Sequence, residues 1–142
     1  DFIISYPGEE EKDFIETLNL IKEVKFINSY SFIFSPRPGT PASRLKPIDK
    51  EIAKERLINL QRVLEDHQIK KNTSLVNSSV EVLVENKLKN QKNYFGRNVF
   101  LNSVLFEGEE KYIGKLVNVK IEKANRNTLF GIIDEKKRMR AA

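Results

Sequence analysis

Cysteine and tryptophan are absent from this sequence, and histidine and methionine occur once each. The lack of cysteine excludes disulfides and thiolate-bound metals within these 142 residues. The single histidine, His67, excludes a metal site built from several histidines. No apolar run approaches the roughly 20 residues of a membrane-spanning helix. No charged start followed by an apolar segment marks a secretory signal.

The remaining composition is typical of a globular protein at the polar end of the range. Apolar residues make up 39% of the chain and charged residues 32%. A chain of 142 residues can hold one ordinary domain or two small ones. It begins at Asp1, directly in a strand-like run, and we therefore expect it to be a piece of a longer protein.

The net charge of +5 is spread unevenly. Residues 1–71 hold 12 Lys and Arg against 12 Asp and Glu, whereas residues 72–142 hold 13 against 8. This asymmetry favours a polyanion-binding module joined to a neutral one. The alternative is a domain whose lysines only keep it in solution.

The stretch Tyr30–Ala42 changes character halfway along. The run Phe32–Phe34 predicts a strand buried on both faces. Three prolines and one glycine within the next residues exclude a helix or a strand and predict a stiff loop. The loop carries Ser35, Arg37 and Thr40. Ligands bind at the carboxyl ends of parallel strands, so it is a candidate site, and an ordinary rigid connection is the alternative.

The start of the chain has the pattern of a β-α-β unit. Phe2–Ser5 reads as a short buried strand, and a helix is expected from the acidic run Glu9–Glu11 to about Lys25. With the strand at Phe32, the two strands should be parallel. Two strands cannot bury a parallel sheet, so we expect further strands upstream of Asp1. The predicted apolar arc of the helix consists of Phe14, Leu18, Leu20, Ile21 and Val24.

A second helix is predicted after Pro47, with Asp49 as its N-cap. His67 lies on its apolar stripe, where a packed residue is the favoured interpretation over a ligand or base. The run Lys70–Ser74 ends the helix and marks a domain boundary. The predicted stripe consists of Ile52, Ala53, Leu57, Leu60, Val63 and Leu64.

From about Leu75 the apolar period changes to two, which is typical of strands. Short strands at this spacing predict a small antiparallel barrel resembling OB-folds, which follow nucleic-acid backbones. The basic tail Lys136–Arg140 is expected to be loose. The expected strands are Val80–Glu85, Tyr94–Phe106 with a break at Gly96, Lys115–Lys123 and Thr128–Ile133. The expected loops and turns are Asn86–Asn93, Glu107–Glu110 and Asn125–Asn127.

Five motifs in order carry a resemblance to a known family. They are D-F-I-I-S-Y-P-G-E-E-E-K-D-F, S-F-I-F-S-P-R-P-G-T-P-A, E-R-L-I-N-L-Q, V-E-V-L-V-E and F-G-R. Together they resemble the C-terminal half of the radical S-adenosylmethionine methylthiotransferases. The members most similar to this chain add a methylthio group to carbon 2 of N6-isopentenyladenosine at position 37 of tRNA. Members acting on threonylcarbamoyl-adenosine share much of the pattern, and P-R-P-G-T-P-A favours tRNA over a ribosomal protein as substrate.

The resemblance implies an α+β chain in two parts. Residues 1–48 would be the βαβα end of a partial (β/α) barrel, residues 49–74 a connecting helix, and residues 75–142 a TRAM domain, a small RNA-binding β-barrel. It also implies S-adenosylmethionine and two 4Fe-4S clusters as cofactors. Because this chain lacks cysteine, the cluster ligands must lie outside it, and it should contain neither metal ligands nor catalytic residues.

The resemblance places one wall of the S-adenosylmethionine pocket in this chain. Glu9 is either a helix-cap acid or a catalytic residue. Arg37 would meet a carboxylate or a phosphate. The implied cofactor-binding residues are Ser5, Tyr6, Pro7 and Gly8 beside the adenosine or methionine, and Ser35, Arg37 and Thr40 at the pocket mouth.

The implied partner of the barrel is the anticodon stem-loop of tRNA. One of Tyr94 and Phe95 is expected to stack on a base and the other to pack in the core. We expect a cytoplasmic monomer that does not engage a membrane. The alternative is a plain RNA-binding module whose β-α-β portion is purely structural. The predicted RNA-binding residues are Lys92, Arg97, Lys115, Lys120, Lys123 and Arg126.

Two departures from the family pattern stand out. Ser5 replaces a usual glycine in the strand beside the bound S-adenosylmethionine. After Arg97, Asn98 replaces the usual Thr or Ser, and the apolar run Val99–Leu101 replaces residues that are often polar. The resemblance therefore carries an RNA contact to Arg97 and not to the positions that follow.

Overall fold

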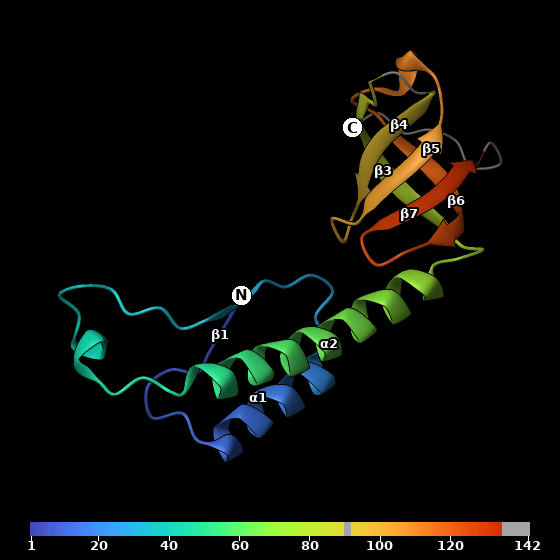
Figure 1. Cartoon of the computed structure of the whole chain (residues 1–142). Coiled ribbons are helices and arrows are strands. Elements are labelled where there is room, and N and C mark those ends of the chain that lie inside the picture. The colour runs from blue at the N-terminus through green and yellow to red at the C-terminus, as the bar shows by residue number, and fades with distance from the viewer. Residues whose placement is uncertain (90–91, 135–142) are drawn as a thin grey trace. The chain divides into compact units, whose positions relative to one another are not determined.

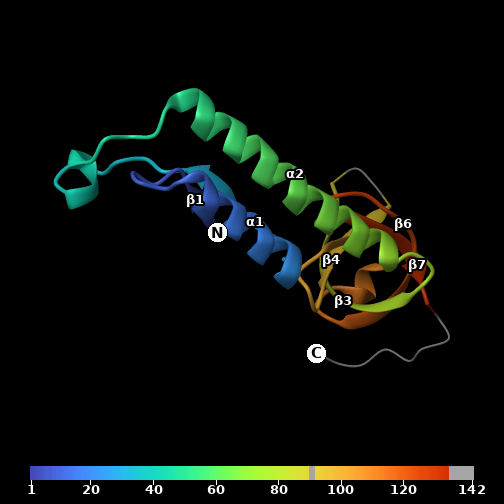
Figure 2. The same cartoon turned by 90° about the horizontal axis from the view of Figure 1, so that it is seen from below.

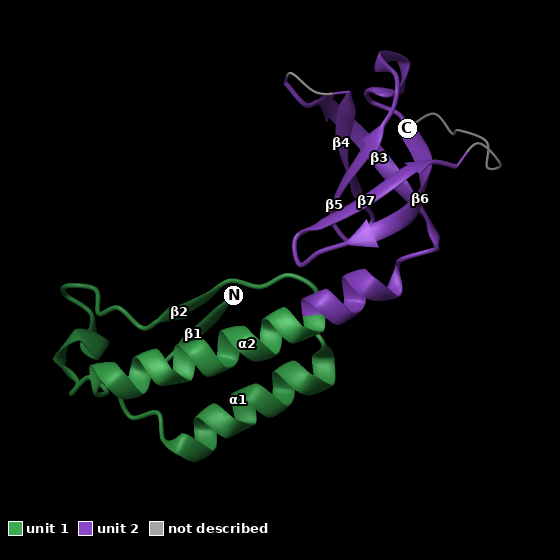
Figure 3. Cartoon of the chain, turned by 45° about the vertical axis from the view of Figure 1, so that its right-hand side comes forward, with its two compact units in different colours: residues 1–67 green, residues 68–142 purple. Residues whose placement is uncertain are grey.

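The computed structural model describes residues 1–89 and 92–134, so the predicted loose tail at Lys136–Arg140 lies outside the described residues. The chain divides into two compact units, residues 1–67 and 68–142 (Figure 3). The division falls inside one long helix, α2 (Lys50–Ser74), so each unit contains part of it.

The first unit contains the predicted β-α-β arrangement (Figure 1). The two strands pair in parallel, with Ile3 opposite Phe32. Asp49 caps α2 as predicted, because its Oδ1 accepts the N–H groups of Glu51 and Ile52. The elements are β1 (Phe2–Ile4), α1 (Glu11–Val24), β2 (Ser31–Ile33), the short 3-10 helix η1 (Pro41–Arg44) and the first part of α2.

Both helices contribute to the core of this unit. Helices α1 and α2 lie side by side (Figures 1 and 2), and their apolar faces meet the buried Ile4 of β1. Burial of one stripe of each helix is the usual source of helix stability in proteins. The buried residues of this core are Ile4, Phe14, Leu18, Ile21, Leu60 and Leu64.

Several predicted core positions of this unit are wrong. Phe32 is 53% exposed and Ile33 37%, because the sheet has only two strands among the described residues. Leu20 is 51% exposed because two residues along a helix turn it about 200° from Leu18. Val24, in the last turn of α1, is also 51% exposed, and Ile52 in α2 is 46% exposed.

The second unit is a closed barrel of five strands in the order β3-β4-β5-β7-β6. The predicted alternation in β3 and β6 is confirmed, because their inward residues are buried and their outward ones are not. The elements are β3 (Ser79–Lys87), β4 (Asn93–Asn98), β5 (Ser103–Glu107), the 3-10 helix η2 (Glu110–Tyr112), β6 (Leu116–Ala124) and β7 (Thr128–Ile133). The barrel core consists of Val82, Val84, Tyr94, Val104, Phe106, Val117, Val119, Ile121 and Leu129.

Two details of the barrel differ from the prediction. The prediction of a wholly antiparallel barrel is wrong, because β5 and β7 pair in parallel and close it. The predicted break at Gly96 is also wrong, since β4 runs through that residue. A Cβ at Gly96 would collide with the main-chain carbonyl of Leu83, so glycine here permits a close approach of β3 and β4. The chain instead turns at residues 99–102, between β4 and β5.

Candidate functional site

A tight loop, Ser5–Gly8, follows β1 and contains four of the predicted cofactor-binding residues. Ser5 is buried and has a left-handed backbone with φ of 60°, which is uncommon outside glycine. Its N–H donates to Oε2 of Glu9 at 2.9 Å, and the N–H of Glu9 donates to the carbonyl of Tyr6 at 2.9 Å. Gly8, with φ of 95°, completes the reversal.

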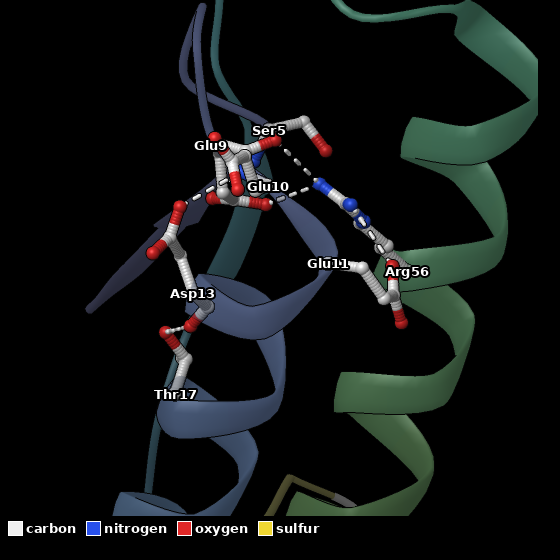
Figure 4. A network of polar contacts seen from close by, with 7 residues as sticks. All are labelled: Ser5, Glu9, Glu10, Glu11, Asp13, Thr17 and Arg56. Atoms are coloured by element: carbon white, nitrogen blue, oxygen red, sulfur yellow. Dashed lines mark hydrogen bonds and ion pairs between the residues drawn. The ribbon is translucent and has the colours of Figure 1, made fainter.

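Glu9 joins this loop to α2 through Arg56 (Figure 4). Nη1 of Arg56 lies 2.8 Å from Oε1 of Glu9, and Nη2 lies 2.9 Å from Oε2 of Glu11. The Arg56 guanidinium also lies 5.4 Å from the ring centroid of Phe14 and is buried with it. Glu9 therefore links the loop to α2. It is not the N-cap of α1, because Glu10 occupies that position and its N–H donates to Asp13.

The proline-rich loop contains a tight turn over residues 37–40. Pro38 and Gly39 occupy its central positions, and Gly39 has φ of 83°, as a type II turn requires. The N–H and the hydroxyl of Thr40 both donate to the carbonyl of Arg37, at 3.2 and 2.8 Å. The Thr40 hydroxyl thus stabilises its own loop, while the Arg37 side chain is exposed.

A cavity of about 650 Å³ lies between the ends of the strands, the proline-rich loop and the start of α2. Its walls are mostly apolar, and they include Pro7, Phe34 and Leu45. Ser5 also lines it, and the buried Ser5 Oγ has no hydrogen-bond partner among the described residues. A buried hydroxyl without a partner is costly unless a ligand or water satisfies it, so this cavity is a candidate binding site.

The structure brings together only some of the predicted cofactor-binding residues. Ser5 and Pro7 line the cavity. Tyr6 makes an edge contact with Phe34, with ring centroids 4.9 Å apart, and is 47% exposed. The members of the set that do not line the cavity are Tyr6, Gly8, Ser35, Arg37 and Thr40.

The predicted RNA-binding cations are all exposed but do not form one cluster. Strands β4 and β6 are both antiparallel to β3, so they run in the same direction and end at the same end of the barrel. Lys92 and Lys115 precede these strands, whereas Arg97 and Arg126 lie at or beyond their ends. Arg97 is opposite Leu83 of β3, and the carbonyl of Lys115 accepts the N–H of Val84, so these two cations flank neighbouring residues of β3. The set is therefore spread along the barrel, with Lys120 and Lys123 on β6.

Arg97 is held by two neighbours. Its Nε lies 3.4 Å from Oε1 of Glu85, and its guanidinium lies 5.7 Å from the ring centroid of Phe95. The prediction that one aromatic packs in the core is confirmed for Tyr94, which is 4% exposed. Phe95 faces outward and is half-buried, so it is the member of the pair that could meet a base.

A buried asparagine network at one end of the barrel was not predicted. Nδ2 of Asn72 donates to the carbonyls of Asn125 and Arg126 at 3.0 and 2.8 Å, and its Oδ1 accepts from Nδ2 of Asn102 at 3.1 Å. Oδ1 of Asn98 accepts the N–H of Asn102 at 2.9 Å. The network joins the end of α2, the β4–β5 loop and the β6–β7 turn. Asparagine in a polar sequence gives no sign of burial, so only the fold reveals it.

Residues 1–89 and 92–134 contain no group of His, Asp and Glu side chains that could hold a metal ion. No described helix is long and apolar enough to cross a membrane.

Comparison with known proteins agrees with this arrangement. The family model of the TRAM domain matches residues 73–133. A protein of Pelagibacter ubique named tRNA-2-methylthio-N(6)-dimethylallyladenosine synthase is 52% identical over 100% of this chain, which covers 32% of that protein. Proteins of the same name from Wolbachia pipientis and Ruthia magnifica are 41% and 42% identical over 92% of the chain, which covers 30% of each. The predicted resemblance is therefore confirmed: this chain, which spans about a third of the length of these synthases, is similar to them throughout, and its residues 73–133 are a TRAM domain.

Proposed function

We propose that this chain is the C-terminal part of a tRNA methylthiotransferase, which adds a methylthio group to carbon 2 of N6-isopentenyladenosine at position 37. The observation that carries the proposal is the 52% identity, over the whole chain, to a protein named for this product. Residues 1–48 would be the end of a partial (β/α) barrel. Their exposed sheet residues, such as Phe32, would then be covered by strands of the rest of the enzyme.

In this proposal the barrel grips the anticodon stem-loop. Exposed lysines and arginines would neutralise phosphates and release counterions, which supplies most of the non-specific affinity for RNA. The half-buried Phe95, with Arg97 against its ring, offers a flat surface for one unpaired base. Binding along the barrel would orient the stem relative to the catalytic part of a monomeric, cytoplasmic enzyme.

In the same proposal the first unit contributes one wall of the S-adenosylmethionine pocket. Ser5 and Pro7 would line it, with the unpartnered Ser5 hydroxyl available to a polar atom of the ligand. Bound S-adenosylmethionine supplies radical chemistry when an iron–sulfur cluster reduces it. The chain has no cysteine, so the ligands of both 4Fe-4S clusters would come from outside these residues. Arg56 and Glu9 would hold the wall in place.

The test of RNA binding is the salt dependence of tRNA affinity in the 142-residue chain. Replacing Arg97 by Ala should weaken binding to unmodified tRNA and reduce the slope of log affinity against log salt by about one. Arg62→Ala, which removes an exposed arginine of α2 outside the barrel strands, is the matched control and should leave the slope unchanged. Negligible tRNA binding at low salt, or equal slopes for wild type and Arg97→Ala, would rule out RNA binding by the barrel surface around Arg97.

The alternative substrate for the same methylthio transfer is threonylcarbamoyl-adenosine in tRNA. The full enzyme with reconstituted clusters should be incubated separately with tRNA carrying isopentenyladenosine and with tRNA carrying threonylcarbamoyl-adenosine. Mass spectrometry of the digested nucleosides then identifies the product. A methylthio group on isopentenyladenosine supports the proposal. A methylthio group found only on threonylcarbamoyl-adenosine would make that nucleoside the substrate instead. Modification of neither tRNA would favour an RNA-binding module whose β-α-β portion is structural.

A further inference from the structure

The loop between β4 and β5 contains three consecutive exposed apolar side chains. Val99, Phe100 and Leu101 are 85%, 43% and 67% exposed. We call these three residues the apolar tip. None of the three belongs to the buried core of the barrel. A compact exposed apolar run of this kind usually marks a contact surface.

The apolar tip is rigid rather than loosely attached. Asn98, which is 5% exposed, accepts the N–H of Phe100 at 3.0 Å and that of Asn102 at 2.9 Å through Oδ1. Leu101 has φ of 61°, a conformation that glycine adopts far more readily than leucine. The fold therefore tolerates local strain while it holds an apolar side chain outward, and such strain is concentrated at functional positions.

Cations lie in the loop of the apolar tip and in the two segments that the asparagine network joins to it. The asparagine network joins three segments, residues 70–74, 97–103 and 125–128, and these contain four Lys and Arg but no Asp or Glu. Nζ of Lys71 lies 5.0 Å from the ring centroid of Phe100. Arg97 at the end of β4 also faces Glu85 of β3, so one carboxylate reaches the border of this surface.

We propose that the apolar tip contacts unpaired bases of an RNA loop while these cations bind its phosphates. This inference rests on the proposed RNA-binding function and assigns part of it to residues 99–101. An aromatic ring beside a lysine suits a base with its phosphate, because every base has a π-face and each nucleotide carries one negative charge. A second protein would supply apolar contact without this regular negative charge.

The test uses the 142-residue chain and two RNA hairpins, one with an ordinary unpaired loop and one with the same loop made abasic. Phe100→Ser should weaken binding to the ordinary hairpin roughly 5- to 150-fold, the loss expected for one stacked base, and leave the salt slope unchanged. Lys71→Ala should instead reduce the slope by about one. Wild type should bind the abasic hairpin at least as weakly as Phe100→Ser binds the ordinary one, because the abasic loop also lacks a base for Phe95.

Two controls separate binding from folding. Phe32→Ser makes the same substitution at a ring that is 53% exposed in the first unit, and it should not change the affinity. Leu101→Gly removes an apolar tip side chain where glycine relieves the strain, so a loss of affinity there cannot come from unfolding.

Equal wild-type affinity for both hairpins, or wild-type affinity in Phe100→Ser and Leu101→Gly, would overturn the inference and leave RNA binding by the barrel intact. Absence of binding to either hairpin at low salt would overturn both. A wild-type dimer that Phe100→Ser converts to a monomer would assign the apolar tip to a second copy of the chain and also overturn the inference.

Discussion

The two units differ in how much of their sheet is covered. The barrel pairs every strand on both edges and buries nine apolar residues at its centre. The sheet of the first unit has two strands, and side chains such as Ile3 and Phe32 are more than half exposed. A closed sheet completes its own core, whereas a two-stranded parallel sheet needs covering by something else. Local sequence patterns alone do not distinguish these two situations.

The largest expected effect of this difference is on autonomous folding. Residues 75–142 should fold alone, because the barrel has no open edge, and residues 1–48 should not. Hydrogen exchange measured on the two separate pieces should show barrel amides protected roughly 100-fold or more over those of residues 1–48. Equal protection would contradict both the comparison and the domain boundary.

A large effect is also expected at the buried ion pair of the first unit. Arg56→Met leaves the carboxylate of Glu9 without its partner and should lower the free energy of unfolding by about 3–5 kcal/mol. Urea unfolding followed by far-ultraviolet circular dichroism measures it. Lys12→Met breaks an exposed pair with Glu10 and should cost less than about 1 kcal/mol. Similar losses of stability in the two variants would show that Arg56 does not hold the loop Ser5–Gly8 in place.

A somewhat smaller effect is expected from adding a methyl group inside the barrel. Gly96→Ala and Gly131→Ala would each press a Cβ against a main-chain carbonyl of the neighbouring strand. Each should destabilise the barrel by about 3 kcal/mol. Gly108→Ala meets the edge of a ring that can shift, and it should cost less than about 1 kcal/mol. Thermal unfolding of the three variants should reproduce this order, and a larger loss for Gly108→Ala would refute it.

The smallest effect is expected at an exposed ion pair beside the barrel. A hydrogen bond to Glu109 raises the pKa of Lys111, so any stability it adds is present at neutral pH and lost as the pH rises through that raised value. Both side chains are more than half exposed, and solvent screens them. Lys111→Met should therefore leave the urea midpoint at pH 7 unchanged. A measurable fall would mean that the pair contributes to the barrel after all.

Short-range patterns predicted the order of both α-helices and most strands of the described residues, although the break between β4 and β5 was placed at Gly96 and the two 3-10 helices were not predicted. The alternation of Val82 and Val84 with Glu81, Leu83 and Glu85 predicted an inward face correctly, and the helix start at Asp49 was also predicted correctly. The exposure of Phe32 was not predictable from its apolar run, because the burial of a strand depends on how many strands lie beside it, and this sheet has two. The parallel pairing of β5 and β7 was also not predictable, since local alternation does not reveal which strands become neighbours.

The candidate site was predicted less well than the fold. Ser5 and Pro7 do line a cavity, but the hydroxyl of Thr40 is used within its own turn. Arg56 was one basic residue among many on a charged helix, and its pairing with Glu9, which precedes α1, arises only in the folded unit. Long-range pairing of this kind has no local signal.

The strand order of the barrel has a consequence for its biosynthesis. β3 is the first barrel strand to emerge from a ribosome, yet it pairs with β6, and β5 finds its second neighbour only in β7, which ends at Ile133. Strands made at about 5–20 residues per second must therefore wait for the last strand before the sheet can close. During that interval Val104 and Phe106 of β5 have no complete core, so the nascent barrel is most vulnerable to aggregation shortly before its synthesis ends.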